Sequence, residues 1–185
     1  MSPRAALPLR LEYIILGLIR RKPVYGYELL QYWNKPDGPG IIWQVKPGTF
    51  YAALEKLENL GFLESTIVPG DASPMRKEYS ITRSGELSFD EWMRKPVLAA
   101  RDFRQDFLVK FYFQDAVTTK EMNSIISRQK TVSQDWLASL QDQYSSSSGF
   151  QREVLSYRLR QVQGILDWLQ DIPNNHVQPL NGEQK

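Results

Sequence analysis

The stretch from Lys46 to Thr82, KPGTFYAALEKLENLGFLESTIVPGDASPMRKEYSIT, decides the fold of this chain. Its first half carries apolar residues at positions i, i+4 and i+7, the spacing of a helix with one buried face: Phe50, Leu54 and Leu57. Pro47 and Gly48 precede this helix, and Gly61 follows it where a left-handed C-terminal cap is common. The sequence therefore predicts a short, well-bounded helix with an open outer face, and such a helix fits the major groove of DNA.

Two strand-like segments, residues 62–68 and 76–82, follow the helix. The residues Pro-Gly-Asp-Ala-Ser-Pro between them break the alternation and indicate a turn. Arg76 and Lys77 open the second segment, where a cation can reach a phosphate while it stays hydrated. Taken alone, these two residues favour an ordinary hairpin with solvated charges. Their position directly after a short helix favours the wing of a winged helix.

Two more helices are predicted upstream. The first has apolar residues at helical spacing from Leu11 to Leu18 and ends at the basic run 20–22 and Pro23. The second covers residues 25–33, and in the loop after it we expect Trp43 to be structural. The predicted fold class is mainly α with a small β-hairpin wing (α+β), with an N-terminal winged helix-turn-helix domain over residues 1–95.

Three strings carry a resemblance to a known family: VYGYELL (residues 24–30), GTFYAALEKLENLGFLES (48–65) and RKEYSITRSGE (76–86). In this order and spacing they resemble the DNA-binding domain of the PadR family of bacterial transcription regulators, over roughly residues 9–95. The family's Tyr-Gly pair falls on Tyr25 and Gly26, and its Thr-x-x-Gly turn on residues 82–85. Many members have proline after the tyrosine of the third helix, whereas this chain has Ala52.

The rest of the chain is predicted to be helical. Thr82 can cap a helix that ends at Pro96, and RDFRQDFLVKFYF (residues 101–113) forms the next helix. A T-x-x-E capping box at Thr118 and Glu121 opens a long helix, and a second long helix runs from residue 150 to Pro173. The stripe expected to pack in this second helix consists of Phe150, Val154, Tyr157, Gln161, Ile165, Trp168 and Ile172. We expect the two long helices to form an antiparallel pair in a C-terminal helical dimerisation domain over residues 96–172, followed by a disordered tail at 173–185.

These helices have more apolar surface than one thin hairpin can bury, so we expect a second copy of the chain to cover the surplus. The segment also resembles, in pattern more than in sequence, the dimerisation region of the larger PadR subgroup that is similar to virulence-gene activators. An intramolecular bundle in a monomer is the alternative. The expected dimerisation residues are Phe103, Phe107, Phe111, Ile125, Val132, Trp136, Leu140, Val154, Tyr157, Ile165 and Trp168.

Composition argues against several other classes of protein. The chain has no cysteine and a single histidine, His176, so disulfides, thiol chemistry and histidine-based nucleophile or metal sites lack their residues. No glycine-rich phosphate loop, long apolar run or cleavable leader is present, so we expect no enzyme, cofactor, metal or membrane segment, and a cytoplasmic location. Because the net charge is only +2, any affinity for DNA must come from the placement of cations.

The residues expected to contact DNA lie on the outer side of the third helix, at the start of the second and on the wing: Tyr25, Tyr27, Lys46, Thr49, Tyr51, Lys56, Arg76 and Lys77. Glu55 and Glu58 would repel phosphate there unless they are paired. A winged helix used for protein contact is the alternative function. The aromatic residues Trp33, Trp43, Phe103 and Phe107 could line a ligand cavity, although their helical spacing favours a core.

The function expected from the sequence is a DNA-binding transcriptional regulator. A homodimer would place two third helices about 34 Å apart, so that each enters the major groove of one half of an inverted repeat. The resemblance implies a repressor, because PadR relatives are mostly repressors. It also implies a possible small aromatic effector, since phenolic acids or drugs release some of these relatives from DNA.

Overall fold

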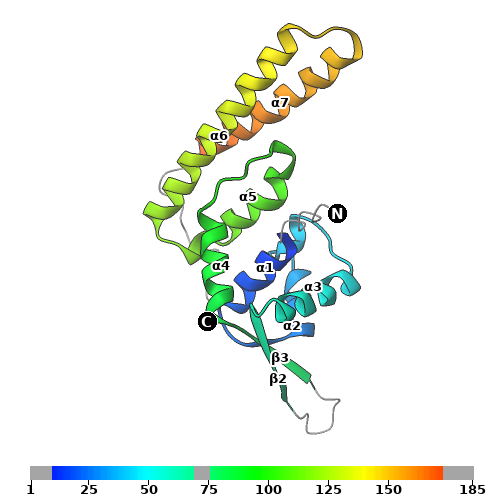
Figure 1. Ribbon diagram of the computed structural model, residues 1–185, viewed down its shortest axis with the longest axis vertical. Helices are drawn as coiled ribbons and strands as arrows, with labels where there is room; N and C mark the ends of the chain where they lie inside the picture. Colours follow the sequence, from blue (N-terminus) through cyan, green and yellow to red (C-terminus); the bar gives the residue numbers. More distant parts are fainter. Residues whose placement is uncertain (1–9, 69–75, 173–185) are drawn as a thin grey trace, which may run out of the picture. The chain divides into compact units, whose positions relative to one another are not determined.

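The computed structural model describes residues 10–68 and 76–172 (Figure 1). The chain divides into two compact units, with the boundary between Met93 and Arg94. Within the described ranges, no helix is both long enough and apolar enough to cross a membrane. The expected tail at 173–185 and the turn at 69–74 lie outside the described residues.

In its described part, the first unit consists of four α-helices, one 3-10 helix and a small antiparallel sheet in the order β1-β3-β2. Its elements, in chain order, are α1 (Arg10–Ile19), β1 (Val24–Tyr25), α2 (Gly26–Trp33), the 3-10 helix η1 (Pro39–Ile41), α3 (Pro47–Asn59), β2 (Leu63–Val68), β3 (Arg76–Ile81) and α4 (Arg83–Arg94). The predicted fold class is confirmed. Strand β1 was not predicted, because two residues are too few to show an alternating pattern.

The core of the first unit explains why α3 takes its position. Phe50, Leu54 and Leu57 are fully buried, as their spacing predicts, and the Phe50 ring packs edge-on against the buried Trp33. Gly61 has a φ of 70°, which is the predicted left-handed cap. Thr82 caps α4, because its hydroxyl accepts a hydrogen bond from the Gly85 N–H. Together these features fix both ends of the segment from α3 to α4.

The second unit is helical in its described part. It consists of η2 (Ala100–Asp102), α5 (Phe103–Tyr112), η3 (Gln114–Ala116), α6 (Thr119–Ser145) and α7 (Gly149–Asp171). Helix α6 begins with the predicted capping box between Thr118 and Glu121. Helices α6 and α7 pack side by side as an antiparallel pair (Figure 1). Trp168 of α7 meets the rings of Phe103, Phe107 and Phe111 edge-on, which joins α5 to α7.

Helix α7 packs on α6 through a different face from the one that the sequence pattern indicated. The side chains buried against α6 are Leu155, Val162 and Leu166. The indicated stripe lies on another side of the helix, where Phe150, Val154 and Tyr157 are 84%, 40% and 63% exposed. Helix α7 therefore has two apolar stripes. One packs on α6, whereas the other is exposed over the first half of the helix and packs on α5 at Trp168.

The segment that opens the second unit is held by polar side chains of α5 and α6. The fully buried Gln129 amide accepts a hydrogen bond from the Val97 N–H at 2.7 Å and donates one to the Val97 carbonyl at 3.1 Å. The Trp136 indole donates to the Leu98 carbonyl at 2.9 Å. The Lys110 amine donates to the Lys95 carbonyl, and burial lowers the pKa of this amine to about 8.

Replacing Gln129 with leucine should destabilise the second unit. Leucine fills a similar volume but leaves the N–H and the carbonyl of Val97 buried without partners, which costs about 2 kcal/mol in total. We expect urea unfolding to show this loss in the Gln129→Leu variant. Asn123→Leu, at an exposed position of the same helix, is the control. Equal stability of the two variants would show that the hydrogen bonds to Val97 contribute little.

Candidate nucleic-acid interface

The amino-terminal half of α3 is open to solvent on one side. Lys46 precedes the helix in an extended conformation, and Pro47 supplies its first turn with a fixed φ. Thr49 and Tyr51 are both exposed, on the side of the helix away from the buried Phe50. This end of α3 also carries the positive end of the helix dipole, which favours contact with anions.

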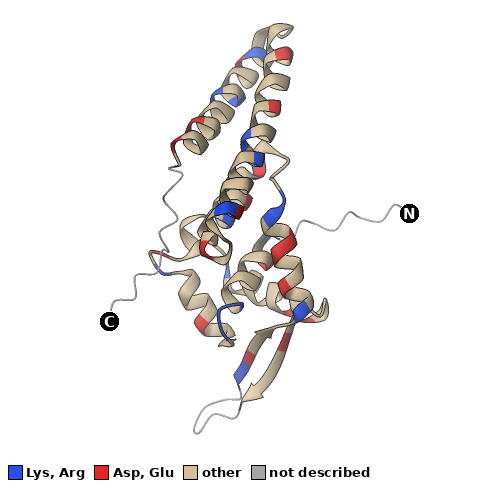
Figure 2. Cartoon of the chain, turned by 90° about the vertical axis from the view of Figure 1, so that its left-hand side faces the viewer, with Lys and Arg blue, Asp and Glu red and all other residues tan. Residues whose placement is uncertain are grey.

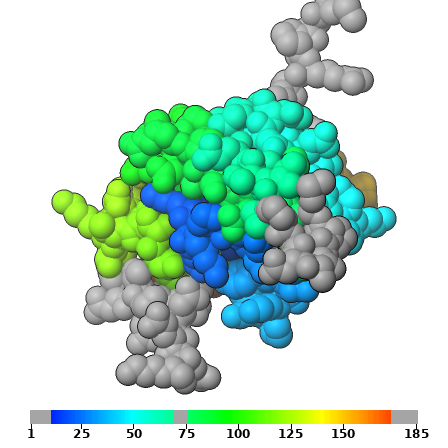
Figure 3. Space-filling view, turned by 90° about the horizontal axis from the view of Figure 1, so that it is seen from below, coloured from blue at the N-terminus to red at the C-terminus, as the bar shows by residue number. Residues whose placement is uncertain are grey.

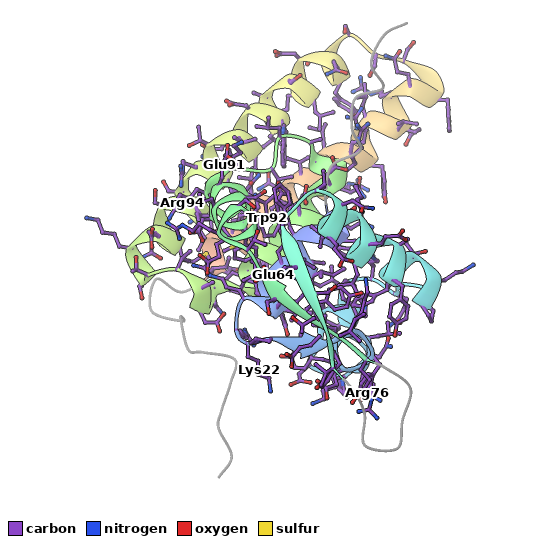
Figure 4. The ribbon with its side chains drawn as sticks, turned by 60° about the horizontal axis from the view of Figure 1, so that its bottom comes forward. Lys22, Glu64, Arg76, Glu91, Trp92 and Arg94 are labelled. Atoms are coloured by element: carbon purple, nitrogen blue, oxygen red, sulfur yellow. The ribbon has the colours of Figure 1, made fainter. Side chains whose placement is uncertain are left out.

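Three side chains, one each from β1, α2 and β3, form a stacked cluster in the same unit. The Tyr25 and Tyr27 rings are nearly parallel with centroids 6.0 Å apart, and the Arg76 guanidinium lies 5.5 Å from the centroid of the Tyr27 ring. Arg76 also donates to the Tyr27 hydroxyl at 3.4 Å. The pKa of Tyr27 lies above its usual value, because burial and the hydrogen bond to Glu28 both disfavour the phenolate. Figure 4 shows Arg76 at the lower end of strand β3.

One of the two glutamates that opposed the DNA interpretation, Glu58, is paired in the structure. Glu58 of α3 accepts a hydrogen bond from the Ser65 hydroxyl of β2 at 2.5 Å and forms an ion pair with Lys77 of β3 at 3.1 Å. These contacts lower the pKa of Glu58, first through Ser65 and then through Lys77, and the Glu58 hydrogen bond raises the pKa of Lys77. One carboxylate therefore connects α3 to both strands of the wing.

Lys56 differs from its expected role as a group open to DNA. Its ammonium lies 2.6 Å from a carboxylate oxygen of Glu12 on α1, whose side chain is only 10% exposed. Lys56 and Lys77 are thus both engaged inside the first unit, one with α1 and the other with α3. Five of the expected residues are exposed at the start of α3, at the start of α2 and on the wing: Tyr27, Lys46, Thr49, Tyr51 and Arg76.

The other expected contact residue, Tyr25, is half-buried and lies in strand β1, which pairs with β3 through Tyr25 and Glu78. Gly26 then allows the start of α2 to lie close to α3, since a Cβ on this glycine would lie 3.2 Å from the Tyr51 ring of α3. In Figure 3 the surface of the first helices, in blue, borders the surface of α3 and the strands, in cyan to green. The tyrosines and Arg76 therefore belong to one structural unit although they are far apart in sequence.

Sequence reasoning did not find Glu12 or Ser65 as partners of the interface, because both are single polar residues in otherwise ordinary elements. Three of the four aromatic residues considered for a cavity are core, because Trp33, Phe103 and Phe107 are at most 6% exposed. The fourth, Trp43, is half-buried and packs edge-on against Trp33. Among the described residues, no group of three or more His, Asp or Glu side chains could hold a metal ion. Figure 2 shows basic and acidic residues interspersed along the ribbons of α6 and α7.

Two family models match the chain. Residues 15–91 match the transcriptional regulator PadR-like family, and residues 103–174 match the family described as virulence activator alpha C-term. The negative transcriptional regulator PadR of Bacillus subtilis is 26% identical over 174 residues, which are 88% of this chain and 94% of that protein. The relatives are transcriptional regulators rather than enzymes.

Solved structures of such regulators are also similar. Bacillus subtilis PadR in complex with operator DNA is 26% identical with a TM-score of 0.46, and the same protein with p-coumaric acid is 25% identical with a TM-score of 0.42. Each match covers 88% of this chain and 96% of that chain. A PadR-like transcriptional regulator from Bacillus cereus is 34% identical with a TM-score of 0.37, over 44% of this chain and 75% of that chain. From its sequence matches, this chain belongs to the PadR-like family of transcriptional regulators.

Proposed function

We propose that this protein binds double-stranded DNA in a sequence-specific manner and regulates transcription. The observation that carries the proposal is the exposed start of α3, with Thr49 and Tyr51, in the same unit as the stack of Tyr27 and Arg76. The Tyr51 ring borders Gly26, the residue that precedes Tyr27. Thr49 and Tyr51 suit base edges or flanking phosphates, whereas Lys46, Tyr25, Tyr27 and Arg76 suit the phosphate backbone. The complex of Bacillus subtilis PadR with operator DNA supports double-stranded DNA as the ligand.

The proposal includes a homodimer formed by the second unit. The uncovered stripe of α7, with Phe150, Val154 and Tyr157, continues along that helix to Gln161 and Ile165. These last two residues line a groove of about 870 Å³ between residues 98–104 and the pair α6 and α7. Exposed apolar residues that run into a groove are typical of a surface that another chain covers. A second copy presents the same stripe and the same groove, as a two-fold interface requires.

Not all of the expected dimerisation residues serve such an interface equally. Four of them are buried within one chain and can act on the interface only by holding its surface residues in place: Phe103, Phe107, Ile125 and Leu140. Val132, Trp136, Phe111 and Trp168 are half-buried. Val154, Tyr157 and the half-buried Ile165, all on the uncovered stripe of α7, are therefore the expected residues with the most surface to offer a partner.

In the proposed mechanism, two-fold symmetry sets the spacing of the DNA contacts. Two copies of α3 about 34 Å apart reach successive major grooves on one side of an inverted repeat. Repression follows if the bound dimer blocks the promoter. The Bacillus subtilis relative is a negative transcriptional regulator, which favours repression over activation. A small aromatic effector would act by changing the distance between the two reading helices. The p-coumaric acid complex of that relative is the reason for expecting an aromatic effector.

The experiment that tests this function is selection of duplexes from a random pool, with sequencing, on protein whose mass in solution is measured by sedimentation. Enrichment of an inverted repeat by a dimer would support the whole proposal. A folded dimer that shows no salt-dependent binding to any duplex would instead favour the alternative, a winged helix that contacts another protein.

The Arg76→Ala variant should weaken binding to all duplexes and lower its salt dependence. Loss of one phosphate contact reduces the slope of log affinity against log salt by about 0.9, and a dimer carries the change twice. Anisotropy titrations over a series of salt concentrations measure this slope. Arg160→Ala, on the exposed side of α7, is the matched control and should leave the slope unchanged. An unchanged slope for Arg76→Ala would remove Arg76 from the interface.

A further inference from the structure

We infer that Glu58 lowers the affinity for DNA electrostatically, because its ion pair holds Lys77 away from the phosphates. Lys77 is then a positioning residue of the wing. This inference rests on the proposed DNA-binding function and adds a determinant of affinity to it. The lysine at this position looks like a phosphate contact in the sequence. Its surroundings in the folded chain point to a different role.

Geometry ties Lys77 to α3 and not to the outer side of the wing. In the register of the hairpin, Ser65 lies opposite Tyr79 and Ile67 lies opposite Lys77. Side chains two residues apart in a strand share a face, so Lys77 projects on the same face as the buried Tyr79, toward α3. Arg76 projects on the other face and reaches Tyr27. The two neighbouring cations of the wing therefore serve different purposes.

The partner of Lys77 is held in place independently of the lysine. The Ser65 hydroxyl donates to one Glu58 oxygen at 2.5 Å, while the Lys77 amine lies 3.4 Å from that oxygen and 3.1 Å from the other. Because the Glu58 side chain is only 30% exposed, it has little freedom to turn away. Its pKa is lowered by these contacts, so the carboxylate remains ionised at neutral pH. Lys77 thus faces a fixed negative charge.

This arrangement has two effects on a duplex that approaches α3. The charge of Lys77 is already neutralised by Glu58, so the lysine displaces few counterions from DNA. Any charge left uncompensated on Glu58 repels the phosphates near the wing. Both effects lower affinity for every sequence equally, because neither involves a base edge. The pair therefore limits non-specific binding while the base contacts of α3 remain in place.

A double-mutant cycle on the full-length dimer tests the inference, with a duplex of random sequence as the probe. Glu58→Gln keeps an acceptor for Ser65 and removes only the charge. We expect it to raise affinity about three- to tenfold at low salt, and to increase the salt slope by about 0.9 for each phosphate that Lys77 gains per subunit. Lys77→Met alone should change the slope little, whereas in the Glu58→Gln background it should abolish the gain.

Glu55→Gln is the matched control, because it removes a carboxylate from the exposed side of the same helix. Its effect should be smaller, because Glu55 acts on Lys77 only through a weak Coulomb interaction, whereas Glu58 also accepts a hydrogen bond from the lysine. A fall in slope for Lys77→Met alone, or no gain for Glu58→Gln, would overturn the inference while leaving the DNA-binding function intact. No salt-dependent binding by the wild-type protein would instead reject the proposed function. Thermal unfolding of each variant verifies that the winged helix is still folded.

Discussion

Tyr157→Glu should convert the protein from a dimer to a monomer and reduce its affinity for an inverted repeat by about a hundredfold or more. The tyrosine is 63% exposed in the single chain and lies between Val154 and Gln161 on the uncovered stripe of α7. A charge buried at an apolar interface without a partner costs several kcal/mol, which exceeds what most such interfaces can lose. A monomer also loses the gain in affinity that comes from binding two half-sites at once.

Sedimentation measures the change in mass, and anisotropy with a selected operator measures the change in affinity. Gln170→Glu is the matched control, since it adds the same charge at an exposed position of α7 on the opposite side of the helix. It should remain a dimer. A Tyr157→Glu variant that stays dimeric, with unchanged helical content, would place the interface elsewhere. A monomer that binds the operator as tightly as the wild type would reject the two-half-site mechanism.

The difference between predicted and observed packing of α7 has a specific physical cause. Its sequence contains two apolar series offset by roughly one residue, one through Val154, Tyr157 and Ile165 and the other through Leu155, Val162 and Leu166. Helical periodicity alone gives both series the same spacing. Which of them faces α6 depends on how well the side chains of both helices interlock, and that is decided by three-dimensional packing.

The first unit was easier to predict because the residues that start and end its helices act locally. Gly61 and Thr82 each act on the backbone within a few residues, so their roles in ending α3 and starting α4 follow from the sequence. The pairing of Lys56 with Glu12 joins residues 44 positions apart. No local pattern reveals such a partner, so the charge of Lys56 alone suggested a contact with DNA. In the structure its ion pair with Glu12 also helps to hold α3 on α1.

The Gly85→Ala variant should lose about 3 kcal/mol of stability or more in the first unit. A Cβ at this position would lie 2.2 Å from the carbonyl oxygen of Phe62 and 2.9 Å from a side-chain carbon of Ile81. The nearest atom belongs to the backbone, so no change of rotamer relieves the clash. The Phe62 carbonyl also accepts the Thr82 N–H at 3.0 Å, and this bond joins the start of the wing to its end.

Relief of the clash therefore requires α4 to move away from the wing, and this links the fold to the proposed function. We expect Gly85→Ala to lower the melting temperature of the first unit and to weaken DNA binding. Gly164→Ala is the matched control: its Cβ meets no atom within 4 Å, and alanine stabilises a helix interior by roughly 0.5–1 kcal/mol relative to glycine. Wild-type stability in Gly85→Ala would mean that α4 yields easily, and that Thr82 alone is sufficient to hold the end of the wing.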